Sequence, residues 1–271
     1  MAENILDATI TDEQYFADEA IDQSLLKEWL KSPASLGLYL CDQENNVVTP
    51  AMRMGTAMHT LTLGAGLPVV EKPARAKTDD EHTWLTSADF VKATTMEQLG
   101  GAKQYFESLE GTPEVTMMCD HPETGLRLKA KADWLPATVD QDGVYRIRDY
   151  KTTVKPLDSA DAAARVIYGD MRYDIQAAFY MMVYRLATGW DGPLGFEFVI
   201  QSKMEPYNTV RARIEEQSDA NQATLARIQE GLASLKEAWG DKSREEFMNT
   251  LLQPQPVVDC GVVTPPAWWQ A

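Results

Sequence analysis

The sequence predicts an α/β (α+β) fold in which helices flank a central mixed sheet. Apolar residues follow a helical period through most of the first 109 residues, alternate as in half-buried strands from 115 to 151, and return to a helical period from about 157. Two more strand-like segments follow, before one long amphipathic helix. Helices, antiparallel strands, further helices and further strands, in this order, are typical of a single sheet covered by helices.

The N-terminal part, residues 1–66, is predicted to be mainly helical. Residues 1–20 are acidic, and we expect loose order or one short helix there. Ser24 is a suitable N-cap for the first clear helix, and Pro33 and Pro50 suit the first turns of the next two. The predicted helices cover residues 25–31, a segment that begins at Pro33, and residues 50–63.

The middle of the chain changes from a helical to a strand period. Residues 67–80 are predicted to be a connection, and 81–109 to be helical with a break at Gly100–Gly101. Predicted strands cover 115–119, 126–133 and 144–151, separated by turns at 121–125 and 140–143. Beyond them we expect helices at 157–167 and 172–188, strands at 195–201 and 209–214, and a helix at 218–239.

Length and composition limit the class of protein. The 271 residues allow one domain over 1–252, followed by a proline-rich tail over 253–271. The net charge of −16 argues against a protein that coats nucleic acid, but it allows an enzyme with a local basic groove. Three widely separated cysteines give no zinc or iron–sulfur spacing. Without a long apolar run or a signal-like N-terminus, we expect a cytoplasmic protein that does not contact a membrane.

Two carboxylates and a lysine are expected to meet near the ends of two predicted strands. Strand alternation places Asp149 and Lys151 on one face, about 7 Å apart along the chain, and a neighbouring strand can bring Asp133 beside Asp149. Hard cations such as Mg²⁺ bind carboxylate and carbonyl oxygens, so the backbone carbonyl of Tyr150 is a further candidate ligand. Lys151 would offset charge that develops on a phosphate. The D-x-K tripeptide alone also fits a surface ion pair at a strand end.

Several motifs, in a fixed order, add to this pattern. Residues 53–59 read RMGTAMH, Glu114 lies in a predicted strand, Asp133 lies in KADW, residues 149–153 read DYKTT, and residues 176–180 read QAAFY. Together with the strand pair that follows, the chain resembles RecE-like phage exonucleases within the RecB/lambda-exonuclease group of PD-(D/E)xK nucleases. The resemblance covers roughly residues 24–216. Ala132 replaces the proline of the class name, which relatives in the RecB group often lack.

The resemblance implies a restriction-endonuclease-like core and a set of site residues. The implied catalytic residues are Asp133, Asp149, Lys151, Glu114, Gln176 and Tyr180. The implied ligands of Mg²⁺ or Mn²⁺ are His59, Asp133, Asp149 and the Tyr150 carbonyl. Glu110 and Glu123 are alternatives to Glu114. We expect Arg53 and Ser32 to contact DNA, with Arg53 as a fork donor for a terminal phosphate.

The implied activity is hydrolysis of double-stranded DNA from its ends, with 5′ to 3′ polarity, in phage-type recombination. The resemblance also implies a single-strand-annealing partner, a ring-like homo-oligomer and a bacterial host cell. A ring would reconcile the negative charge with DNA binding, because only its channel must be basic. A structure-specific endonuclease and a catalytically inactive DNA-binding module of the same fold are the alternatives. Every core catalytic position is filled, which favours an enzyme.

Overall fold

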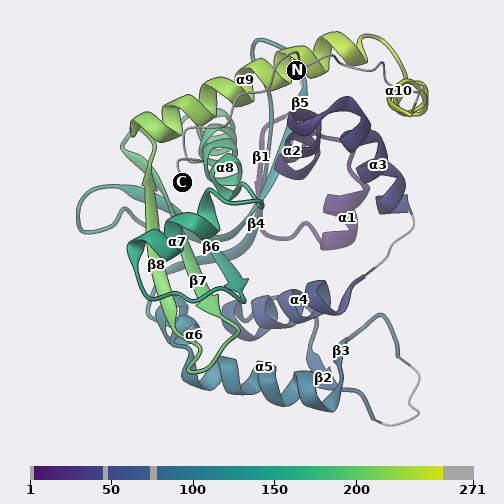
Figure 1. Cartoon of the computed structure of the whole chain (residues 1–271). Helices are drawn as coiled ribbons and strands as arrows, with labels where there is room; N and C mark the ends of the chain where they lie inside the picture. Colours follow the sequence, from purple (N-terminus) through teal and green to yellow (C-terminus); the bar gives the residue numbers. More distant parts are fainter. Residues whose placement is uncertain (1–2, 45–47, 74–77, 253–271) are drawn as a thin grey trace, which may run out of the picture.

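The computed structural model describes residues 3–44, 48–73 and 78–252. In these ranges a six-stranded mixed sheet has the strand order β1-β4-β5-β6-β7-β8 (Figure 1). Its strands are β1 (Ile5–Asp7), β4 (Gly111–Asp120), β5 (Arg127–Pro136), β6 (Tyr145–Thr153), β7 (Leu194–Ser202) and β8 (Thr209–Glu215). Within this sheet, β6 and β7 pair in parallel, and the other neighbouring strands are antiparallel. The predicted fold class, a mixed sheet flanked by helices, is therefore confirmed.

Helices cover both faces of the sheet (Figure 1). The helices are α1 (Asp12–Ala17), α2 (Gln23–Lys31), α3 (Pro33–Glu44), α4 (Pro50–Leu63), α5 (Ser87–Leu99), α6 (Ala102–Glu107), α7 (Ala160–Ile167), α8 (Tyr173–Thr188), α9 (Asp219–Trp239) and α10 (Arg244–Leu251). Helix α8 packs on β4, β5 and β7 and supports α2 and α9, whereas α4 packs on β6 and α6 on β7. Each face therefore has its own hydrophobic core.

Strand β6 shows how alternation divides residues between the two cores. Ile147 is fully buried in the core that contains α2, α8 and α9. Tyr150 is fully buried in the other core, among residues of α4, α5 and α6. Asp149 has the parity of Ile147, so its side chain faces α8. The side chain of Lys151 lies on the same face.

Several element boundaries differ from the sequence prediction. Asp22, not Ser24, caps α2, and its carboxylate accepts the amide hydrogen of Leu25 at 2.8 Å. Ser24 lies inside the helix, where its hydroxyl accepts a hydrogen bond from Gln23. Asp133 does not end its strand, since β5 continues to Pro136. Asp133 therefore lies within the strand, with hydrogen-bonded strand residues before and after it.

Short elements escaped the sequence analysis. The predicted connection over 67–80 contains β2 (Val69–Glu71), which pairs in parallel with β3 (Thr83–Leu85) at the start of the region predicted to be helical. Strand β1 and helix α10 were also missed. The helix break at Gly100–Gly101 is confirmed, with Gly101 at φ 76°. The predicted tail over 253–271 lies outside the described residues. In the described part of the chain, no helix has the length and apolarity needed to cross a membrane.

Candidate functional site

Three carboxylates form a row across strands β4, β5 and β6. Pairing of Pro113 with Trp134 and of Val115 with Ala132 places Glu114 opposite Asp133. Pairing of Trp134 with Arg148 then places Asp133 opposite Asp149 on the next strand. Directly opposed side chains on neighbouring strands lie close together, and like charges there are destabilising. We call Glu114, Asp133 and Asp149 the carboxylate row.

His59 reaches this row from helix α4. Its Nδ1 lies 3.5 Å from Oδ2 of Asp133, and its ring packs edge-on against Tyr150 at a centroid distance of 5.4 Å. One ligand atom from each of His59, Glu114 and Asp133 lies within 4.8 Å of the other two. An imidazole and clustered carboxylates are a donor set for a divalent cation such as Mn²⁺ or Mg²⁺. The residues present therefore fit the implied metal.

The backbone at Glu114 is unusual for a strand. Glu114 has φ 55°, in the left-handed region, which costs a residue with a Cβ atom about 1–3 kcal/mol. Arg172, the residue before α8, has φ 46°. Two of the three non-glycine residues with positive φ in the described ranges thus border the site. Such conformations concentrate at functional sites, because the surrounding structure must hold them in place.

Burial and mutual repulsion raise the pKa values of the carboxylate row. Burial raises the pKa of Asp149 to about 6, and the neighbouring Asp133 adds to the effect. Burial also raises the pKa of Asp133, and burial together with Asp133 raises that of Glu114. A bound divalent cation would relieve this repulsion, as it favours the ionised form of each carboxylate.

Lys151 and Gln176 hold Asp149 from two sides. The Lys151 ammonium lies 2.5 Å from Oδ2 of Asp149, and Nε2 of Gln176 donates to Oδ1 at 2.6 Å. Burial opposes the charge on Lys151, but Asp149 and Asp133 raise its pKa overall, so it remains an ammonium. Tyr180 lies one helical turn after Gln176 and is buried. The backbone amide of Tyr150 donates to Oδ2 of Asp133 at 2.7 Å and fixes that carboxylate.

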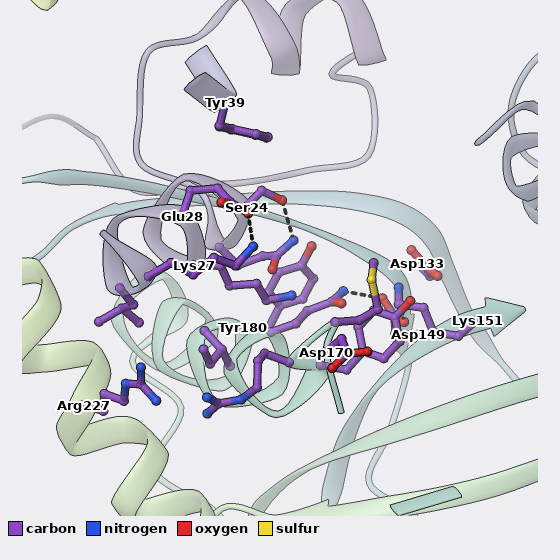
Figure 2. Close-up of a pocket in the computed structure, with 18 residues that line it drawn as sticks. Ser24, Lys27, Glu28, Tyr39, Asp133, Asp149, Lys151, Asp170, Tyr180 and Arg227 are labelled. Atoms are coloured by element: carbon purple, nitrogen blue, oxygen red, sulfur yellow. Dashed lines mark hydrogen bonds and ion pairs between the residues drawn. The ribbon is translucent and has the colours of Figure 1, made fainter. Parts of the chain in front are cut away.

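A cavity of about 520 Å³ opens from this site toward helix α2 (Figure 2). Asp133, Asp149, Lys151, Gln176 and Tyr180 line one part of it. The other charged residues that line it are the cations Lys27, Lys31, Arg172 and Arg227 and the carboxylates Glu28 and Asp170. We call this space the basic cavity.

Comparisons with known proteins agree with this architecture. The family model described as "PDDEXK-like domain of unknown function (DUF3799)" matches residues 23–246. The chain belongs to this PDDEXK-like family. A solved structure from Eubacterium rectale, described as a "Putative exonuclease", has TM-score 0.58 at 15% identity over 96% of each chain. This likeness supports the nuclease-like fold. A second structure, SSO0001, has TM-score 0.32 at 12% identity over 86% of this chain and 95% of that one, too low to carry an argument. The search of curated proteins gave no match.

The structure of this PDDEXK-like chain brings together most of the residues expected from its sequence. His59, Glu114 and Asp133 form the candidate metal cluster, whereas both oxygens of Asp149 face Lys151 and Gln176. Glu114, not Glu110 or Glu123, is the glutamate of this cluster.

The two expected DNA contacts do not line the basic cavity. Arg53 is exposed on α4. The hydroxyl of Ser32 accepts the amide hydrogen of Ser35 at 3.0 Å, which caps the start of α3. The sequence reasoning overlooked Lys27 and Arg172. The spacing of Lys27 and Lys31, four residues apart on one helix, was the signal available for the first.

Proposed function

We propose that this PDDEXK-like protein is a metal-dependent DNA exonuclease that hydrolyses phosphodiester bonds from double-stranded ends. One observation carries the proposal: a row of three carboxylates, flanked by His59 and Lys151, borders a cavity with five basic side chains and, besides the row, two acidic ones. Carboxylates that bind a cation, beside a lysine that faces a phosphate, are the groups that phosphodiester hydrolysis requires.

His59, Glu114 and Asp133 would hold the cation, and Asp149 would join them from β6. A bound Mg²⁺ or Mn²⁺ supplies Lewis-acid polarisation of the phosphate and a more acidic bound water. Lys151 would place a partly buried positive charge beside the reacting phosphate and offset the negative charge that develops there. Gln176 orients Asp149 by donating to one of its oxygens, which leaves that carboxylate little rotational freedom.

The basic cavity would receive the DNA strand. Lys27 lies 5.5 Å from the centre of the Tyr173 ring, and Lys151 lies 5.3 Å from the same ring. Burial lowers the pKa of Lys27 to about 8, with Lys151 adding to the effect, and a bound phosphate would raise that pKa again. Arg172 is held by Asp174 through two hydrogen bonds of 2.8 and 2.7 Å, yet it retains donors for a phosphate.

The choice of an exonuclease rests on the RecE-like motifs and on the description of the structural neighbour from Eubacterium rectale, and the 5′ to 3′ polarity rests on the motifs alone. The same motifs support a role in phage-type recombination with a single-strand-annealing partner. The same motifs support a ring-like homo-oligomer in the host cytoplasm, and such a ring would reconcile the net charge of −16 with DNA binding, because only its channel must be basic.

The test is digestion of linear duplex DNA labelled at either the 5′ or the 3′ end. With Mg²⁺ the parent protein should release label from the 5′ end first, and EDTA should stop the reaction. Lys151→Met and Asp149→Asn should lower the rate at least about 100-fold, because the first removes the positive charge beside the phosphate and the second removes a negative charge that holds the cation. Arg165→Met, which removes a surface cation outside the basic cavity, is the matched control and should keep the parent rate.

A covalently closed circular duplex separates the alternatives. An end-dependent enzyme leaves the circle intact, whereas cleavage of the circle indicates an endonuclease. A protein that binds duplex DNA but digests neither substrate with Mg²⁺ or Mn²⁺ would be an inactive binding module, and the proposal would be abandoned.

A further inference from the structure

Lys131 contacts the carboxylate row from outside the cluster of candidate ligands. Its Nζ lies 3.1 Å from Oε2 of Glu114. The same ammonium forms an ion pair with Asp12 of helix α1. The Lys131 side chain is 15% exposed and that of Asp12 is 70% exposed. One cation therefore connects a residue of the site with a carboxylate on the protein surface.

The position of Asp12 does not depend on this ion pair. Lys129, two residues before Lys131 on β5, donates to the backbone carbonyls of Tyr15 at 2.7 Å and Asp18 at 2.6 Å. These bonds anchor α1 to the sheet. Thr11 also caps α1 with a reciprocal hydrogen-bond pair to Gln14. Loss of the Asp12 carboxylate should thus leave α1 in place.

Two cations would compete for Glu114 once a metal binds. A divalent ion held by His59, Glu114 and Asp133 would share the Glu114 carboxylate with the Lys131 ammonium. Positive charges this close repel each other strongly when they are partly buried. Without metal, the ammonium offsets the repulsion between Glu114 and Asp133. With metal, Asp12 offers the ammonium a second, exposed carboxylate outside the cluster.

We propose that Lys131 is a built-in competitor for the divalent cation, and that Asp12 favours metal binding by drawing the Lys131 ammonium away from Glu114. This inference rests on the proposed metal-dependent function. Lys131 is here a positioning residue, which acts through Glu114 and sets the affinity of the site. A surface carboxylate on the N-terminal helix thereby controls how much metal the site needs.

The experiment measures Mn²⁺ binding by titration calorimetry at pH 8 without DNA. Lys131→Met should tighten binding about fivefold or more, because it removes a positive charge beside the ion. Asp12→Asn should weaken binding about threefold, because the ammonium then stays on Glu114. The double variant should bind like Lys131→Met, since Asp12 acts through the lysine. Lys131→Arg, which keeps the charge, should restore binding close to the parent value.

Glu13→Gln is the matched control, because Glu13 is an exposed carboxylate on the same first turn of α1. It should bind Mn²⁺ like the parent. Thermal unfolding in EDTA checks that each variant folds, and Lys131→Gln replaces the methionine variant if that one does not. A parent protein that binds no Mn²⁺ would remove the proposed metal site itself. Parental affinity in both single variants, or shifts in the same direction, would overturn only the role of Lys131 and Asp12.

Discussion

At the scale of single residues, Lys27 differs from Lys31, Lys151 and Arg172, the cations of the basic cavity that pair with carboxylates. Lys31 pairs with Glu28 at 2.6 Å and Arg172 with Asp174 at 2.7 Å. In the part of the chain that the structure describes, no carboxylate pairs with Lys27. A half-buried cation without an ion pair is poised to receive an anion from solution.

We therefore expect Lys27→Met to raise the KM for duplex DNA about tenfold, since a hydrogen bond to a charged group contributes about 1.5–3 kcal/mol. The dissociation constant of Mn²⁺ should stay within about twofold of the parent value. Steady-state digestion at varied DNA concentration, with Mn²⁺ titration alongside, measures both. Arg53→Met is the comparison, because it removes the same charge from an exposed position outside the cavity. If Arg53→Met raised the KM more than Lys27→Met did, Arg53 would be the DNA contact, as the sequence suggested.

The reason that the sequence pointed to Arg53 is its place beside a recognisable motif. Arg53 and His59 are six residues apart on α4, which separates them by about 240° around the helix. Proximity in sequence thus did not become proximity in the site. Asp133, Asp149 and Lys151 were predictable because strand alternation and the D-x-K spacing define their geometry locally. The place of Lys27 in the cavity depends on how α2 packs against α8, whereas its spacing from Lys31 shows only that the two lysines share one face of the helix.

At the scale of elements, strands β6, β7 and β8 share an ion cluster, whose member on β6 is Arg148, the residue before Asp149. Glu197 of β7 is fully buried and accepts hydrogen bonds from Arg211 at 2.8 Å and Arg213 at 2.8 Å, both on β8. Tyr105 of α6 donates to the same carboxylate. Burial opposes the negative charge, but Arg211, Tyr105 and Arg213 outweigh it and lower the pKa of Glu197 to about 2.

This cluster predicts a specific loss of stability in acid. Because the folded pKa is below the ordinary value of 4.5, the stabilisation is complete above about pH 4.5 and is lost as pH falls toward 2. Its size is of the order of 2 kcal/mol, since the two arginines are partly solvated. Urea unfolding of the parent and of Glu197→Gln at pH 7, 4 and 3 measures it. The variant should be less stable at pH 7 and should lose less on acidification; equal pH dependence would contradict the assignment.

The long elements were predictable and the short ones were not. The helix over 219–239 and the strands of the central sheet have enough residues for a period to emerge. Strands β2 and β3 have three residues each, too few to show alternation, and they are fixed by pairing with each other. The cap of α2 was misplaced by two residues because both Asp22 and Ser24 have capping side chains. Only the fold decides between them.

At the scale of the whole molecule, the excess of acidic residues means that a bound cation should increase the free energy of unfolding. The chain has 41 acidic and 25 basic residues, excluding histidine, and three of the carboxylates are opposed in one row. Mn²⁺ at 100 times its dissociation constant should stabilise the fold by about 2.7 kcal/mol. For a chain of this size that corresponds to a rise in Tm of roughly 5–10 °C.

Differential scanning calorimetry with Mn²⁺, and with NaCl at matched ionic strength, checks this expectation. EDTA should reverse the rise in Tm. The variant Glu114→Gln/Asp133→Asn should unfold at the same temperature with and without Mn²⁺, since it lacks two of the three clustered ligands. A rise that persists in this variant would mean that the ion acts through the general negative charge of the surface and not through the site.

The left-handed backbone at Glu114 matters for anyone who selects heat-tolerant forms of this protein. Glycine adopts φ 55° without the steric cost that a glutamate bears there, so a screen for folding alone would enrich glycine at position 114. The selected variants would keep the sheet but lose the Glu114 carboxylate, a candidate metal ligand. Directed evolution of this chain must therefore score catalysis and heat resistance together in every round.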